Sequence, residues 1–178
     1  MSTIQTAIAW DVFESPIGPL TIEATPRGLS GVWFPGKGRR RDEATRDPES
    51  LAFATAQLEE YFAGERRSFD LTLDLRVSSF DRAVCERLLE IPYGATVSYG
   101  ELAEAVGRPD ILRGVAAAVG RTPVPIVVPC HRVIGADGSL TGYGGGLQRK
   151  QALLDLERRV AAGHAPEPAW TFRQLAIL

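Results

Sequence analysis

Short apolar segments separated by proline and glycine occupy the first third of the chain, and they restrict its fold more than any other feature. The segments span residues 10–15, 20–24 and 29–34. The breaks between them contain Pro16, Gly18, Pro26 and Gly28. This spacing predicts three short strands joined by turns, in a meander. The strict alternation of apolar and polar residues over 69–75 predicts another half-buried strand.

One helix is expected among these strands. Asp47 and Pro48 have the chemistry of a helix N-cap and a first helical residue, and they lie at the end of a charged loop, residues 36–49. Apolar positions then recur at helical spacing as far as Gly64, where the helix is expected to stop. Residues 1–76 are therefore expected to form a small α/β domain.

The pattern then changes to successive helices. The first is expected to begin at Ser79 with Leu88 and Leu89 both facing inward. The second is expected to begin at the capping-box pattern of Ser98 and Glu101 and to end at Gly107. The third is expected over residues 111–119. The second and third helices, joined by a short turn at residues 107–109, resemble a helix-turn-helix, although many such pairs bind no nucleic acid.

Charge is unevenly distributed along the chain, whose net charge is −2. Residues 105–150 contain six cationic and two acidic side chains, a local charge of +4, so the rest of the chain carries −6. A basic segment in an acidic protein is one footprint of DNA binding. On charge alone, an ordinary charged surface is the open alternative. The small side chains around Arg113 likewise suit either a tightly packed core or a close approach to another molecule.

Cysteine and histidine are scarce. Cys85 and Cys130 are too few for a disulfide framework, so both are expected as free thiols of a reducing compartment. With His131 and His164 they offer no zinc-finger spacing, so no metal is expected. No segment reaches the roughly 18 apolar residues of a membrane helix, and residues 1–10 lack a secretory pattern. The expected location is the cytoplasm.

The two thiols are expected to differ. Cys85 occupies a core-like helix position and is expected to be inert. Cys130 follows an apolar run, 126–128, that predicts a buried strand, and it precedes His131 and Arg132, cations that favour the reactive thiolate. On extended backbone the side chains of Cys130 and His131 point apart, so proton transfer between them would need a bridging water. By itself the Cys-His pair is weak evidence of catalysis.

The residues around Cys130 form a far more specific pattern. They closely resemble the O6-alkylguanine-DNA alkyltransferase family, the methylated-DNA–protein-cysteine methyltransferases. The resemblance covers residues 10–158 and rests on segments 15–21, 91–94, 96–99, 126–135 and 138–146, with Lys150, Leu153, Leu154 and Glu157.

The resemblance implies an α+β fold. A ribonuclease-H-like α/β domain over residues 1–76 would precede a winged helix-turn-helix-like alkyltransferase domain over 77–160, and residues 161–178 would form a tail. It also implies a DNA repair protein that removes the alkyl group from O6-alkylguanine, with O4-alkylthymine as a second candidate substrate. No cofactor is implied.

The catalytic roles of the family fall on four residues. Cys130 would accept the alkyl group, His131 would act as a base through water, and Glu157 would orient the imidazole. Tyr99 would rotate the nucleotide's phosphate and donate a proton to the departing guanine oxygen. Because water does not readily cleave the resulting thioether, each molecule would react once.

Other residues would hold the DNA and the extruded base. Arg113 would enter the duplex in place of the flipped base, from a helix lying in the minor groove. The expected DNA contacts are Tyr99, Arg113, Gly114, Ala117, Ala118 and Arg132. The expected base pocket consists of Pro125, Val133, Tyr143 and Gly144, with Thr122 at the hinge between the DNA helix and the active-site strand.

Four positions depart from the family pattern. Thr122 replaces a usual Asn, so some amide hydrogen bonds at the hinge must be lost or replaced. Ala116 replaces a usual Gly, which favours helix and slightly crowds the groove. Gly144 replaces a Ser found in some members, and Cys85 replaces a frequent Trp. These changes bear on rate and substrate range more than on the reaction itself.

Three other functions are alternatives for such a chain. An alkyltransferase-like lesion sensor would bind the damaged base without transfer, but such proteins lack the acceptor cysteine. A cysteine hydrolase would turn over repeatedly, and a transcriptional regulator would need an effector domain that the sequence does not show. The expected partner is double-stranded DNA bearing O6-alkylguanine, with no membrane. The protein is expected to be a monomer in solution, with several molecules side by side on DNA as an option.

Overall fold

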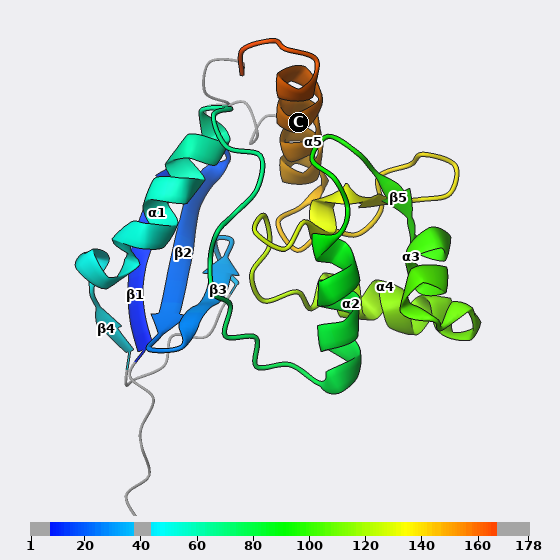
Figure 1. Cartoon of the computed structure of the whole chain (residues 1–178), viewed down its shortest axis with the longest axis horizontal. Helices are drawn as coiled ribbons and strands as arrows, with labels where there is room; N and C mark the ends of the chain where they lie inside the picture. Colours follow the sequence, from blue (N-terminus) through cyan, green and yellow to red (C-terminus); the bar gives the residue numbers. More distant parts are fainter. Residues whose placement is uncertain (1–7, 38–43, 167–178) are drawn as a thin grey trace, which may run out of the picture.

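The computed structural model describes residues 8–37 and 44–166 (Figure 1). Its N-terminal half is a four-stranded sheet with one helix on it. The strands are β1 (Ile8–Ser15), β2 (Gly18–Thr25), β3 (Gly28–Trp33) and β4 (Ala44–Arg46), in the spatial order β3-β2-β1-β4. The first three form the predicted antiparallel meander. The charged loop is shorter than expected, because Ala44–Arg46 pairs in parallel with β1.

The helix of this half is α1 (Pro48–Phe62). Asp47 is its N-cap, as predicted, and the carboxylate accepts a hydrogen bond from the Ser50 backbone N–H at 3.1 Å. The buried side of α1 includes Leu51, Leu58 and Tyr61. That side packs against the sheet, so α1 directs Tyr61 into the interior of the molecule.

Residues 69–75 are extended but do not form the predicted strand. Leu29 at the edge of β3 exchanges two backbone hydrogen bonds with this segment, and the single bridge is Leu29–Leu73. Further along β3, the Val32 N–H donates to the Pro123 carbonyl at 2.9 Å instead. The ladder ends after one bridge because the edge of β3 is shared between two segments.

The C-terminal half is mostly helical. Its elements are α2 (Ser79–Leu89), β5 (Val97–Ser98), α3 (Tyr99–Val106), α4 (Leu112–Gly120), β6 (Val133–Ile134) and α5 (Leu147–Ala161), with 3-10 turns η1 (Pro109–Ile111) and η2 (Cys130–Arg132). The capping box of α3 is confirmed at Ser98 and Glu101, and Gly107 ends α3 in the left-handed region. Leu89 is 48% exposed, so the prediction that it faces inward is wrong.

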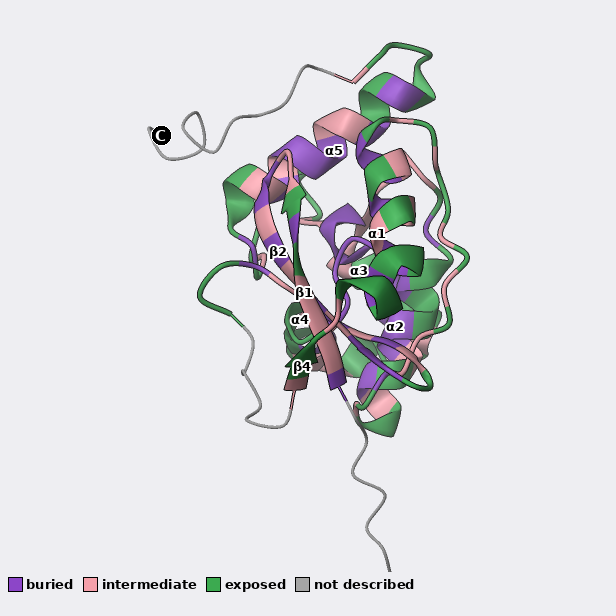
Figure 2. Ribbon diagram, turned by 90° about the vertical axis from the view of Figure 1, so that its left-hand side faces the viewer, coloured by how far each residue is buried: buried purple, intermediate pink, exposed green. Residues whose placement is uncertain are grey.

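One cluster of buried apolar side chains runs through both halves. Figure 2 shows buried residues on the sheet, on α2 and along α5. Cys85 belongs to this cluster, as predicted. Within residues 8–37 and 44–166, no helix is long and apolar enough to cross a membrane.

Candidate active site

Cys130 is placed by a buried turn followed by η2. The predicted strand at 126–128 is wrong, although all three side chains are buried. Ile126 has a φ of 76°, and Pro125 and Val128 form an isolated bridge across this turn. A β-branched residue in the left-handed region is uncommon and requires support from its surroundings. The packed interior supplies that support, because Ile126 is fully buried.

His131 follows Cys130 and is also fully buried. Its Nε2 lies 2.7 Å from Oε1 of Glu157, while Nδ1 is buried and has no hydrogen-bond partner among the described residues. Burial lowers the pKa of His131, although Glu157 opposes this shift. A neutral imidazole that donates from Nε2 to Glu157 leaves Nδ1 as an acceptor. The ring is therefore arranged to receive a proton at Nδ1.

Glu157 is the centre of a buried hydrogen-bond network. Besides His131, it accepts from Arg132 Nε (2.8 Å) and Nη2 (2.9 Å), from the Tyr61 hydroxyl (2.8 Å) and from the Gly94 N–H (3.1 Å). Burial alone would raise the pKa of Glu157, but hydrogen bonds and charge from His131 and Arg132 lower it to about 2. Glu157 is therefore a fixed negative charge beside the imidazole.

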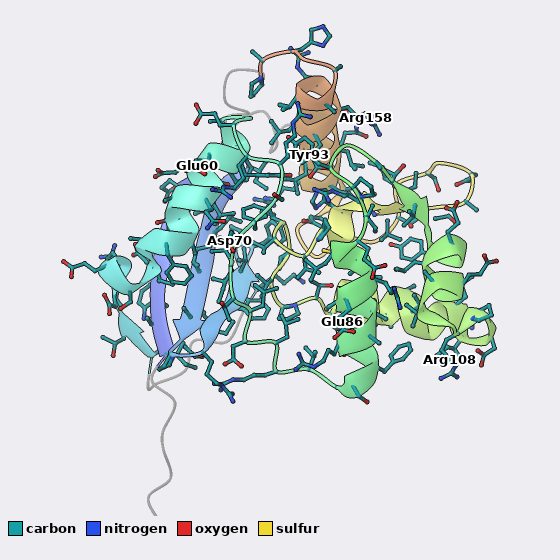
Figure 3. All side chains as sticks on the ribbon, in the orientation of Figure 1. Glu60, Asp70, Glu86, Tyr93, Arg108 and Arg158 are labelled. Carbon is teal, nitrogen blue, oxygen red and sulfur yellow. The ribbon has the colours of Figure 1, made fainter. Side chains whose placement is uncertain are left out.

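Arg132 is in the interior rather than at a DNA-facing surface. Its Nη1 donates to the Ile91 carbonyl at 2.6 Å, and its guanidinium lies 5.6 Å from the centre of the Tyr93 ring. Figure 3 labels Tyr93 close to α5. Because Glu157 and Ile91 occupy the guanidinium, Arg132 holds the buried carboxylate, and the expectation that it contacts DNA is not supported.

Tyr61 is a residue of this network that the sequence reasoning missed. It belongs to α1 of the N-terminal half, is fully buried, and donates to Glu157. A tyrosine on the apolar side of a helix needs a buried partner for its hydroxyl. That requirement is the feature of the sequence that could have indicated a polar contact at Tyr61. The partner itself, 96 residues further along the chain, could not be found from local pattern.

Cys130 is 5% exposed. Burial raises the pKa of Cys130 to about 12, although the Thr122 hydroxyl and the Lys150 ammonium group oppose the rise. Lys150 is itself buried, and its Nζ donates to the carbonyls of Val133 (2.5 Å) and Thr141 (2.9 Å). Cys130 is therefore a thiol in the free protein, whereas the sequence predicted that His131 and Arg132 would favour the thiolate. A proton must be removed for the sulfur to react.

A cavity of about 140 Å³ adjoins the sulfur. Of the residues expected in the base pocket, Pro125, Tyr143 and Gly144 line it, as does Thr122. Val133 is not part of this lining. The cavity is also lined by residues of the N-terminal half that the sequence did not indicate, namely Val32, Trp33, Phe34 and Lys37.

A wider groove of about 510 Å³ lies between α4 and the loop at 141–144. Tyr99, Arg113 and Ala116 line it, and it shares Gly120 and residues 142–144 with the cavity beside Cys130. The Tyr99 hydroxyl donates to the Thr141 carbonyl at 3.3 Å across the groove. The groove along the exposed side of α4 therefore adjoins the cavity beside the Cys130 thiol.

Helical geometry divides the small residues of α4 between its two sides. Arg113 and Ala117 are exposed, and Gly114 is half-buried. Ala118 is 1% exposed and packs in the core, so its expected contact with DNA is wrong. Ala116 faces the groove instead. Residues two positions apart lie on different sides of a helix. In a run of alanines, the sequence does not indicate which of them face the core.

Comparisons with known proteins agree with this arrangement. Residues 79–159 match the DNA binding domain of the 6-O-methylguanine DNA methyltransferase family, and residues 8–75 match its ribonuclease-like domain. A methylated-DNA–protein-cysteine methyltransferase of Mycolicibacterium paratuberculosis is 50% identical over 161 residues, which cover 89% of this chain and 95% of that protein. The chain belongs to the 6-O-methylguanine DNA methyltransferase family. A methyltransferase of Methanosarcina acetivorans is 47% identical and covers 82% of this chain and 96% of its own length.

Solved structures of methyltransferases share the fold. The Mycobacterium tuberculosis OGT in complex with DNA has a TM-score of 0.81 at 47% identity, covering 86% of this chain and 94% of that one. The M. tuberculosis O6-methylguanine methyltransferase has a TM-score of 0.80 at 45% identity, covering 90% and 96%. The predicted α+β class, with a ribonuclease-like part followed by a DNA-binding part, is therefore confirmed.

Proposed function

We propose that this methyltransferase takes the alkyl group of O6-alkylguanine in double-stranded DNA irreversibly onto Sγ of Cys130. The observation that carries this proposal is the position of the thiol. It adjoins a small cavity that shares part of its lining with the groove along α4, and the next residue, His131, is paired with the buried Glu157. An extruded base could reach the sulfur along this path.

The reaction needs a proton acceptor and a good nucleophile. The Cys130 proton would pass through a water molecule to Nδ1 of His131, and Glu157 would stabilise the imidazolium through Nε2. The thiolate attacks the alkyl carbon and forms the carbon–sulfur bond as the carbon–O6 bond breaks. The electron pair of the broken bond stays with the guanine oxygen. Tyr99 is the proposed donor of the proton that guanine then takes up. The thioether remains on the protein, so the reaction occurs once.

The DNA contacts belong to the same proposal. Arg113 is exposed on α4 at the groove, where it can replace the extruded base in the stack. The small exposed surface of Gly114 and Ala117 suits close contact with the minor groove. The protein would act as a monomer, with side-by-side binding on DNA as an option. It would act in the cytoplasm, where the acceptor thiol stays reduced.

Intact mass spectrometry tests the proposal. After incubation with duplex DNA containing O6-methylguanine, the protein should gain the mass of one methyl group and no more. Cys130→Ala should abolish the gain, whereas Cys85→Ala, which removes the other buried thiol, should retain it. Tight binding without a mass change would contradict alkyl transfer and favour a lesion sensor. The same assay with O4-methylthymine measures the second candidate substrate.

A further inference from the structure

The wall of the cavity beside Cys130 comes from both halves of the molecule. Pro125, Tyr143 and Gly144 belong to the C-terminal half, while Val32 and Phe34 belong to the N-terminal half. Phe34 directly follows β3, the edge strand of the sheet that lies nearest to the helical half (Figure 1). We propose that Phe34 limits the size of the alkyl group that Cys130 accepts. This inference rests on the proposed function.

Phe34 is held firmly in this wall. It is 5% exposed, and its ring meets the Tyr143 ring edge-on, with centroids 5.5 Å apart and an interplanar angle of 62°. The Arg149 guanidinium lies 5.8 Å from the centre of the same ring. A ring restrained by these contacts cannot swing aside without disturbing Tyr143, which lines the cavity too.

The glycine-rich loop also closes against Phe34. A Cβ atom at Gly145 would lie 2.8 Å from the Phe34 ring, so the absence of a side chain there lets the loop approach. Arg149 fixes this approach, because Nη1 donates to the Gly145 carbonyl (3.0 Å) and Nε to the Ile17 carbonyl (2.7 Å). Arg149 therefore links the loop and the Phe34 ring to the β1–β2 turn.

The chemistry of the two walls differs. The polar edge of guanine needs hydrogen-bonding partners, and the loop side offers them through its backbone at 142–144 and through the buried Tyr143 hydroxyl, which has no partner within the described ranges. The N-terminal side also includes Trp33 and Lys37, which carry polar atoms, but the side chains of Val32 and Phe34 offer only carbon atoms. The apolar alkyl substituent is best placed against such a surface. A methyl group needs little space, whereas each further carbon must compete with the Phe34 ring in a closely packed interior.

Transfer rates from a small and a large substituent test this role. Duplexes with O6-methylguanine and with O6-benzylguanine are compared on the wild type, Phe34→Leu and Phe34→Ala, with each adduct followed over time by intact mass. Phe34→Ala should raise the benzyl-to-methyl rate ratio by about tenfold or more. Phe34→Leu should raise it less, by about threefold.

Phe13→Ala is the matched control. Phe13 is a buried phenylalanine of the same sheet, it stacks on Phe62, and it is not part of the cavity lining. This variant loses comparable core packing but should leave the ratio unchanged. If Phe34→Ala does not fold, Phe34→Leu decides the question. A ratio that stays at the wild-type value while methyl transfer proceeds would overturn the role of Phe34. A wild type that never gains a methyl group would overturn the proposed function and this inference with it.

Discussion

The network around Glu157 and the exposed side of α4 differ in almost every physical property. Glu157 and His131 are fully buried, and four residues donate hydrogen bonds to the one carboxylate. On α4, Arg113 is exposed to solvent on the same helix as the small residues Gly114 and Ala117. The comparison indicates that the residues proposed to transfer the proton are fixed before DNA arrives, because buried charges must be paired within the protein. The recognition surface can instead complete its interactions on the DNA.

The largest expected effect is at the buried carboxylate. Glu157→Gln keeps the shape of the side chain but leaves the Arg132 guanidinium without its opposite charge inside the protein. Breaking a buried pair in this way costs about 3–5 kcal/mol of stability. The transfer rate should fall as well, because the imidazolium of His131 loses its counter-charge. Urea unfolding and single-turnover mass kinetics measure the two effects.

Tyr61→Phe is the graded control for that variant. It removes one donor to Glu157 and keeps the ring contacts with Phe62, Phe69 and Tyr93. The expected loss is about 1 kcal/mol, the contribution of an ordinary hydrogen bond. Equal losses in Tyr61→Phe and Glu157→Gln would show that the buried charge itself contributes little, and the contrast with α4 would then fail.

Acid should destabilise the protein through the same network. The pKa of Glu157 is about 2 in the folded protein against an ordinary 4.5, so its contribution is complete above pH 4.5 and is lost as the pH falls towards 2. The loss is on the order of 3 kcal/mol. The pKa of His131 is lowered from 6.5, so acidification below pH 6.5 also favours the unfolded state. The free energy of unfolding, measured in urea, should decrease steadily as the pH is lowered from 7 to 3.

A surface carboxylate provides the comparison for this acid effect. Asp110 pairs with Arg108 on the exposed α3–α4 turn, and Figure 3 shows Arg108 at the outer edge of the helical half. Asp110→Asn should leave the pH dependence nearly unchanged, whereas Glu157→Gln should flatten it below pH 4.5. A steep acid loss that survives in Glu157→Gln would place its origin elsewhere.

On the open side, Arg113→Ala should affect duplex substrate selectively. Without the side chain proposed to fill the vacated stack, extrusion should become less favourable, and transfer from duplex O6-methylguanine should slow by about tenfold or more. Transfer from free O6-benzylguanine, which needs no extrusion, should change little. Arg108→Ala removes an equal charge from the same helix pair and serves as the control. Equal slowing on duplex and free base would remove the extrusion role of Arg113.

Local signals in the sequence predicted most helices and their ends, because caps such as Asp47 and Ser98 act on neighbouring residues. Signals that depend on distant residues were not predictable. Residues 126–128 have the composition of a strand, but tertiary packing holds Ile126 in a left-handed turn. Arg132 was expected to contact DNA because its local sequence does not reveal that Glu157, 25 residues away, pairs with it.

The candidate site shows the same division. Cys130, His131 and Glu157 were indicated by a continuous motif and its family pattern, and the structure brings His131 and Glu157 together. Phe34 and Tyr61 come from the other half of the chain and carry no motif of their own. Their contributions depend on how the two halves pack, which a linear pattern does not encode.

Thr122 lies where the two compared regions meet, since it follows α4 and lines the cavity beside Cys130. Its hydroxyl donates to the Val119 carbonyl at 2.8 Å. Burial raises the pKa of both Cys85 and Cys130, and the same hydroxyl opposes the rise at each sulfur. A hydroxyl has only one proton, so Thr122 can donate to the Val119 carbonyl or to a thiolate, but not to both at once.

The smallest expected effect follows from that shortage of donors. An asparagine amide has two N–H groups, so Thr122→Asn can donate to the Val119 carbonyl and to the Cys130 sulfur together. The added hydrogen bond should stabilise the thiolate and raise the transfer rate by about fivefold. Thr122→Val keeps the shape without a donor and should slow transfer by a similar factor. If single-turnover kinetics show the same rate for both variants, donors at this position do not limit the reaction, and the rate is set by the buried network or by extrusion.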